Sequence, residues 1–156
     1  MIQVSRCYDA VNAPQALWWA PIEGDARAVM RELSEAVDGA GLAPADALDA
    51  KADIVALLKQ VEACSLEDRD AVVPVQRDPA LFEVRFQILR HDLCVRLYET
   101  EDSRLPGFIV ALHAHQKVTN VSQAEISERQ NAEIDVASRR HVAGWPSCWG
   151  VTTNPS

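Results

Sequence analysis

The chain has 156 residues, 48% of them hydrophobic, and a formal net charge of −8 at pH 7. This length and hydrophobic content suit one globular domain with one core. An acidic chain lacks the generally basic surface with which proteins bind nucleic acid, so any nucleic-acid site must be a local patch. Because residues 1–80 carry a net charge of −7, we expect such a patch only in the second half of the chain.

The lack of a recognisable targeting signal and the wide spacing of the cysteines lead us to expect a cytoplasmic protein. The sequence contains no run of about 18 apolar residues, so we expect no membrane span and no membrane partner. The first residues lack a basic segment followed by an apolar one, so we expect no secretory signal. The four cysteines (Cys7, Cys64, Cys94 and Cys148) are widely spaced and form no C-x-x-C pair, which is typical of free thiols.

The first half of the chain predicts an edge strand and two helices. Residues 17–22 contain two tryptophans before Pro21, a proline that would end an edge strand. The next helix is expected to be capped by Asp25 and to end at Gly39 or Gly41, because apolar residues between them recur at helical spacing. A second amphipathic helix should begin near Pro44. Together the two helices predict an αα-hairpin whose apolar stripes need a partner surface.

Strand periodicity dominates the middle of the chain. Apolar and polar residues alternate through residues 82–88 and 93–98 and again through 108–117. The third segment would place Phe108, Val110, Leu112 and Ala114 on the apolar face.

A turn centred on His91-Asp92 would set Ile88 opposite Val95 and Arg85 opposite Tyr98. A four-residue loop would keep the same two faces.

The chain ends with one more expected helix. Ser122 and Glu125 form a capping box, which predicts a helix over about residues 123–141. We interpret residues 1–143 as one domain and 144–156 as a C-terminal tail without an assigned role. The predicted fold class is α+β, with two N-terminal helices packed on one face of a small antiparallel sheet of three to four strands, closed by the C-terminal helix.

The polar residues of the three predicted strands form the candidate site. Alternation places the apolar residues under the helices, so the polar residues should share the opposite, open face. This set combines three cations, two imidazoles and a phenol: Arg85, Arg96, Tyr98, His113, His115 and Lys117.

These residue types suit metal-independent cleavage of RNA. The reaction needs a base for the ribose 2′-hydroxyl, an acid for the leaving oxygen and cations around the phosphorane. Histidine can act as acid or base near neutral pH, arginine binds phosphate with two donors, and tyrosine can stack on a base. Two alternative interpretations of these residues stay open. Each of the six alone is an ordinary resident of a solvated sheet face. His113 and His115 could also be metal ligands, although we expect neither a metal nor a cofactor.

Four segments carry a resemblance to a known family. They are Leu81-Phe82-Glu83-Val84-Arg85, then Val95-Arg96-Leu97-Tyr98, then the stretch 109–117 that contains His113, His115 and Lys117, and finally the stretch 133–141. In order and spacing they resemble the strands and closing helix of HigB-type toxins of the RelE superfamily. The resemblance spans roughly residues 16–141.

The resemblance implies the toxin of a type II toxin–antitoxin system, acting as a ribosome-dependent mRNA endoribonuclease (mRNA interferase) without a metal. It implies that a helix-turn-helix antitoxin binds and silences the protein. The catalytic residues it points to are Arg96, Tyr98, His113, Lys117 and His141. The RNA-binding residues are Arg85, His115, Arg139 and Arg140.

Two other hypotheses remain at this point. The chain could be a non-catalytic module that binds a protein partner, an alternative that the acidic first half favours because it suits a basic partner. It could also be a gyrase inhibitor of the ParE kind, which would need no catalytic histidine.

Overall fold

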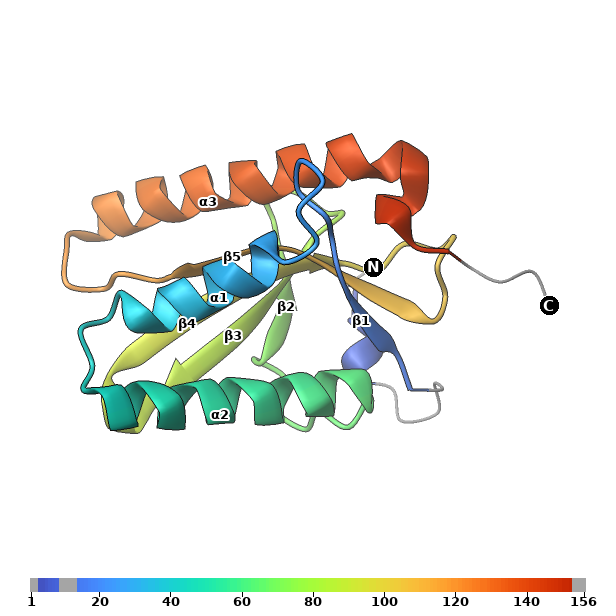
Figure 1. Ribbon diagram of the computed structural model, residues 1–156. Coiled ribbons are helices and arrows are strands. Elements are labelled where there is room, and N and C mark those ends of the chain that lie inside the picture. Colours follow the sequence, from blue (N-terminus) through green and yellow to red (C-terminus); the bar gives the residue numbers. More distant parts are fainter. Residues whose placement is uncertain (1–2, 9–13, 153–156) are drawn as a thin grey trace.

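The computed structural model of the protein describes residues 3–8 and 14–152. Its helices and strands form three layers, with the sheet between α3 on one side and the pair α1 and α2 on the other (Figure 1). In chain order the elements are the 3-10 turn Arg6–Tyr8, β1 (Ala16–Trp19), α1 (Ala28–Asp38), α2 (Pro44–Glu62), β2 (Val72–Pro74), β3 (Phe82–Ile88), the 3-10 turn Leu89–His91, β4 (Leu93–Thr100), β5 (Phe108–Gln116), α3 (Gln123–Gly144) and the 3-10 segment Trp145–Gly150.

The sheet has five strands in the order β1-β5-β4-β3-β2, and it is mixed, because β1 runs parallel to β5 while the other pairs are antiparallel. The predicted edge strand is confirmed as β1. The predicted fold class is wrong: a strand precedes the two helices, and the sheet is larger than the antiparallel sheet of three to four strands that we expected. Strand β1 pairs with β5, the strand farthest from it in the sequence, and local periodicity does not encode such a tertiary contact.

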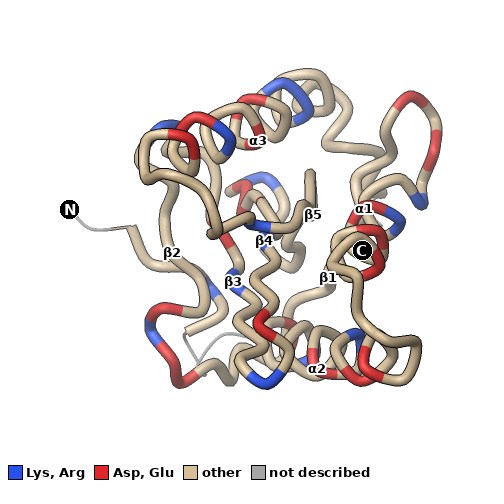
Figure 2. The backbone as a smooth tube through the Cα atoms, turned by 90° about the vertical axis from the view of Figure 1, so that its left-hand side faces the viewer, with Lys and Arg blue, Asp and Glu red and all other residues tan. Residues whose placement is uncertain are grey.

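The expectation of an open sheet face is also wrong. Figure 2 shows α3 and α2 on opposite sides of the strands. One core cluster joins α1 and α2 to apolar residues such as Val84, Val95 and Leu97. A second, separate cluster joins Val110 and Leu112 to α3 and to the segment that follows it. Helices therefore cover both faces, as in a sheet that has no solvated side.

The β3–β4 hairpin keeps the predicted faces in a different register. Ile88 lies opposite Leu93 and Arg85 opposite Arg96, which shifts the predicted pairs by two residues. The cause is a four-residue loop, residues 89–92, in which Asp92 adopts the left-handed conformation with φ 49°. A shift of two residues preserves the alternation, so the side chains predicted to share a face still do.

A β-bulge changes the faces of β5. Tyr98 pairs with His113, but the next residue, Glu99, pairs with Ala111. Leu112 is therefore the extra residue on β5, and the side-chain alternation reverses there. Consequently Val110 and Leu112 pack under α3, whereas Ile109 and Ala111 join the core below α1 and α2, opposite to the prediction.

The three helices lie close to their predicted bounds. Helix α2 begins at Pro44, and the Ser122 hydroxyl caps α3 by accepting the amide of Glu125 at 3.2 Å. Helix α1 differs, because the carboxylate of Asp25 accepts the Arg27 amide and pairs with Arg31 while the helix itself begins at Ala28. Within the described ranges, no helix has the length and apolarity that crossing a membrane requires.

The C-terminal segment folds back onto the domain as far as residue 152, and residues 153–156 of the predicted tail lie outside the described residues. Trp149 is buried, its indole Nε1 donates to the Arg140 carbonyl, and its own carbonyl accepts from Trp18. Gly144 makes this packing possible: a Cβ there would lie 2.0 Å from Cδ1 of Trp149. Trp149 therefore packs directly against the glycine at the end of α3.

Candidate functional site

The register brings five of the predicted site residues onto the α3 face of the sheet. Arg85, Arg96 and His115 form one cross-strand row, and Tyr98 and His113 are a neighbouring pair. Because α3 covers this face, Tyr98 is fully buried, and Arg96 and His113 are only 3% and 6% exposed. The predicted co-localisation is thus present, but in a layer between sheet and helix instead of on open surface.

Three rings stack in this layer. The centroids of Tyr98 and His115 are 5.5 Å apart, those of His113 and His115 are 6.0 Å apart, and all three rings lie within 17° of parallel. The Tyr98 hydroxyl lies 3.0 Å from Nε2 of His115. Regular alternation places His113, His115 and Tyr98 on this face, because the register of β4 and β5 is unbroken from Tyr98–His113 to Arg96–His115 and the bulge at Leu112 lies just before it.

His115 is held as a neutral imidazole. Its Nδ1 lies 3.0 Å from the carbonyl oxygen of Gln116, which can only accept, so Nδ1 carries the proton. Its Nε2 is then an acceptor facing the Tyr98 hydroxyl. Burial lowers the pKa of His115 below the ordinary value of 6.5 because it disfavours the imidazolium form. A neutral imidazole with an acceptor nitrogen is the form that a general base requires.

His113 has the opposite electrostatic environment. Its Nδ1 lies 3.0 Å from Glu32 of α1, and its Nε2 forms a short hydrogen bond with Glu133 of α3. Burial alone would lower the pKa of His113, but the hydrogen bonds to Glu133 and Glu32 outweigh it and raise the pKa above 6.5. The two histidines of one strand are therefore tuned in opposite directions.

Glu32 links three elements. It reaches the edge of β5 beyond the end of β1, and its two oxygens accept from Arg140 at 2.7 and 2.9 Å. Burial alone would raise the pKa of Glu32, but hydrogen bonds from His113 and Arg140 lower it to about 2. Arg140 also donates to the Leu112 carbonyl at 2.9 Å. This bidentate pair fastens α3 to α1 and to the bulge.

Glu83 balances the two arginines of the row. Its Oε1 accepts from Arg85 Nε at 2.8 Å and lies 3.3 Å from Arg96 Nε, and its Oε2 accepts from Gln130 of α3. Burial lowers the pKa of Arg96 below its ordinary value. The catalytic role that the resemblance implies for Arg96 is therefore constrained, because its guanidinium is buried and faces Glu83 within the layer.

A cavity opens the layer to solvent beside α3. It has a volume of about 340 Å³. His115 and Lys117 line it from the β5 side, and Arg129, Gln130 and Glu133 line it from α3. Two cations, a neutral imidazole and a carboxylate thus face one space large enough for a phosphate and part of a ribose. Of the predicted residues, only His115 and Lys117 line this space.

The remaining predicted residues lie elsewhere. His141 stacks on Trp149 at a centroid distance of 5.4 Å, at the end of α3 where the C-terminal segment docks. Arg139 is exposed and lines a different cavity with Pro21 and Glu23. His141 and Arg139 therefore do not reach the His115 cavity. The sequence pattern did not indicate how α3 crosses the sheet, so this placement could not be predicted.

The sequence analysis missed the carboxylates of the layer as site residues: Glu32, Glu83 and Glu133. Their signal is indirect. A helix as polar as α3 buries only Ile134 and Ala137, so its other inward residues must find polar partners. The facing strands carry buried cations, and a buried cation needs an acidic partner. Acidic residues such as Glu133 are therefore expected in this layer.

No group of three or more His, Cys, Asp and Glu side chains is arranged to hold a metal within residues 3–8 and 14–152. Comparison of the chain with protein-family models, with curated proteins and with solved structures gives no match.

Proposed function

We propose that this protein is a cytoplasmic toxin that cleaves mRNA on the ribosome, with the His115 cavity as its active site. The observation that carries the proposal is the pairing of a neutral imidazole, whose Nε2 is an acceptor, with two cations around one solvent-open space. The resemblance of the strands to HigB-type toxins supports the same activity.

His115 is the general base in this proposal. The ribose 2′-hydroxyl replaces the Tyr98 hydroxyl as donor to Nε2, and the imidazole takes its proton as the 2′-oxygen attacks phosphorus. The bond from phosphorus to the 5′-oxygen then breaks, which leaves a 2′,3′-cyclic phosphate and a 5′-hydroxyl. Lys117 and Arg129 stabilise the charge on the phosphorane.

The pair His113–Glu133 supplies the proton for the leaving 5′-oxygen. Glu133 lines the cavity with its side chain 35% exposed and is hydrogen-bonded to Nε2 of the buried His113. Its pKa is lowered, so Glu133 acts as a carboxylate that relays the Nε2 proton of the His113 imidazolium to the leaving oxygen, which leaves His113 neutral. The raised pKa of His113 favours the imidazolium that this step needs. Base and acid therefore come from two histidines with oppositely shifted pKa values, a recurrent arrangement in acid–base catalysis.

We propose the ribosome as the site of action on the resemblance to HigB-type toxins alone. Affinity for RNA, free or ribosomal, comes largely from phosphate contacts, which a net charge of −8 opposes, so the contacts with RNA must come from local cations such as Lys117 and Arg129. We propose a helix-turn-helix antitoxin as the silencing partner, on the resemblance alone.

The test is a translation reaction programmed with a defined mRNA. The wild-type protein should arrest translation and cut the ribosome-bound message, while the same RNA without ribosomes stays intact. His115→Gln should reduce cleavage 10²- to 10⁴-fold, the usual contribution of a positioned base. Failure of the wild-type protein to cut ribosome-bound mRNA would contradict the proposal.

A second candidate is a non-catalytic module that binds a protein. The burial of Arg96, Tyr98 and His113 under α3 favours it, because sealed side chains can serve folding alone. This candidate predicts that translation continues at the wild-type rate and that His115→Gln changes nothing but stability.

A further inference from the structure

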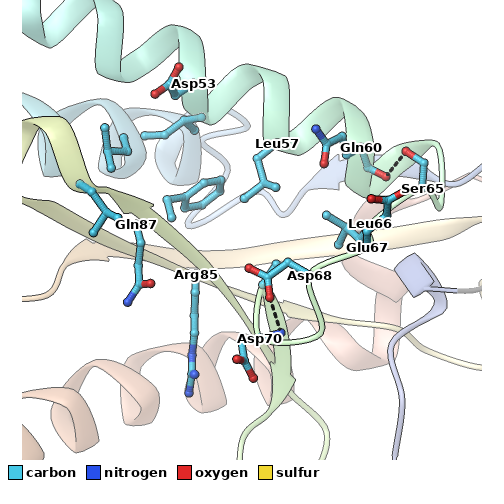
Figure 3. Close-up of a pocket in the computed structure, with 15 residues that line it drawn as sticks. Asp53, Leu57, Gln60, Ser65, Leu66, Glu67, Asp68, Asp70, Arg85 and Gln87 are labelled. Carbon is cyan, nitrogen blue, oxygen red and sulfur yellow. Dashed lines mark hydrogen bonds between the residues drawn. The ribbon is translucent and has the colours of Figure 1, made fainter.

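A second cavity lies at the outer edge of β3 and shares no lining residue with the His115 cavity. It has a volume of about 1000 Å³. Its walls are α2, the loop of residues 65–71 and the last residues of β3 (Figure 3). None of the proposed catalytic residues lines it.

This edge of β3 is only partly paired. Strand β2 follows it up to Val84, which lies opposite Val72, and the Arg85 amide donates to the Ala71 carbonyl at 2.7 Å. Beyond Arg85, no strand of the described residues lies on this side. Because strand geometry repeats every two residues, the amide and carbonyl of Gln87 point to the same open edge. The backbone there is a template for another strand.

Two different surfaces flank the open edge. On the α2 side the wall is apolar, with Leu57 and the buried residues Ile54 and Phe86. On the other side, Arg85 and Gln87 point away from α2 (Figure 3). A strand that enters between them would turn alternate residues to apolar and to polar surroundings, as an amphipathic strand requires.

The rim of the cavity is acidic. Four carboxylates line it, and Arg85 is the one guanidinium among its lining residues. The acidic members are Asp53, Glu67, Asp68 and Asp70. Arg85 is itself paired with Glu83, and Asp53 is paired with Arg90, so the charge that a ligand meets comes from Glu67, Asp68 and Asp70. Charge complementarity therefore selects a basic occupant and disfavours an acidic one.

We propose that this edge binds an extended, basic segment of a partner protein, which adds a strand to β3 beside residues 85–88. Backbone hydrogen bonds to Arg85 and Gln87 provide the register, and alternate apolar side chains pack on Leu57 and Phe86. Lysine or arginine side chains of the segment meet Glu67 and Asp70. This binding surface is separate from the His115 cavity and does not depend on nuclease activity.

A synthetic peptide provides the probe: seven residues in which Lys alternates with Val, acetylated and amidated at its ends. Two matched peptides replace every Lys by Glu, or the central Val by Pro. Calorimetric titration against the full chain should show that the Lys peptide binds at least tenfold more tightly than either control. Hydrogen exchange should show new protection of the Gln87 amide.

Variants of the full chain locate the binding. The double substitution Glu67→Lys, Asp70→Lys should weaken the Lys peptide at least tenfold, while Glu128→Lys on the exposed side of α3 leaves it unchanged. Gln87→Pro removes the edge amide and should abolish binding, whereas Gln87→Ala retains the amide and the binding. If Gln87→Pro does not fold, the affinity of the Glu67→Lys, Asp70→Lys variant and the hydrogen-exchange protection of the Gln87 amide test the proposal instead.

Equal binding of the Lys and Glu peptides, or an unprotected Gln87 amide in the complex, would overturn the proposal. Ribosome-dependent cleavage by the Glu67→Lys, Asp70→Lys variant should match the wild type, so failure of this surface and failure of the nuclease proposal are distinguishable.

Discussion

The two faces of the sheet are held by different forces. Below α1 and α2 the contacts are almost wholly apolar, through residues such as Leu97, Val95 and Phe86. Below α3 a smaller apolar cluster adjoins charged groups, where Glu83, Glu133 and Arg140 each reach from one layer to another. The face covered by α1 and α2 therefore defines the fold, and the face covered by α3 can carry chemistry. Hydrogen-bonded polar groups fix a geometry that apolar packing leaves undefined.

The largest expected effect comes from the apolar face. Leu97→Ala removes a fully buried side chain and should lower the free energy of unfolding by about 2–5 kcal/mol. Urea denaturation followed by circular dichroism measures it. The same substitution at Leu48, which is 69% exposed on α2, should change stability by less than about 0.5 kcal/mol. Equal losses at both positions would mean that this face is not the main core.

The polar face should respond to loss of its central carboxylate. Glu32→Gln breaks the bidentate pair with Arg140 and should cost about 2 kcal/mol at pH 7. Since the folded pKa of Glu32 is about 2 against an ordinary 4.5, this contribution is full above pH 4.5 and is lost as the pH falls toward 2. Denaturation of wild type and variant across that range measures the difference.

Glu35→Gln, on the exposed side of the same helix, is the matched control and should show no such pH-dependent difference. A Glu32→Gln effect that stays constant down to pH 2 would argue against an ionised Glu32 in the folded protein.

Titration of the two buried imidazoles gives a sharper test of the polar face. The pKa of His113 should lie above 6.5 and that of His115 below it, although both are on one strand face. Carbon-13 or nitrogen-15 NMR shifts of the rings measure both. The raised pKa of His113 stabilises the fold fully below pH 6.5, and this contribution is lost as the pH rises through the folded pKa. Reversal of the order of the two midpoints would refute the proposed assignment of base and acid.

The smallest effect is expected at the outer surface of α3. Asp135 pairs with Arg77 at 2.8 Å, but both side chains are more than 40% exposed. Exposed pairs are screened by solvent and contribute little. Asp135→Ala should therefore leave the urea midpoint unchanged within error. A clear loss would show that surface pairs, and not the buried layer, hold α3 to the sheet.

The elements with strong periodicity could be predicted from the sequence. The hairpin of β3 and β4 has an unbroken alternation, so its two faces were right even though the left-handed Asp92 shifted the register by two. The placement of α3 could not be predicted, because a helix that buries only Ile134 and Ala137 carries too narrow an apolar stripe to specify a face. The bulge at Leu112 leaves no local signal either, and it decides that Val110 and Leu112 pack against α3.

The candidate site was predictable in its strand residues and not in its helix residues. Arg85, Arg96, Tyr98, His113 and His115 lie on one face, as the alternation indicated. His141 was placed in the site by resemblance along the closing helix, but the end of α3 lies at the docked Trp149. Contacts such as Glu32–His113 join residues 81 positions apart, and no spacing rule reaches that far.

The proposed chemistry is tested most directly by mRNA cleavage on programmed ribosomes, with wild type, His115→Gln and His91→Gln compared at equal concentration. His91 lies in the β3–β4 turn, where it contacts Asp49, and it provides a histidine control away from the cavity. We predict that wild type and His91→Gln cut the message equally and that His115→Gln cuts at least 10²-fold more slowly while remaining folded. Equal cleavage by all three proteins, or none by the wild type, would contradict the account.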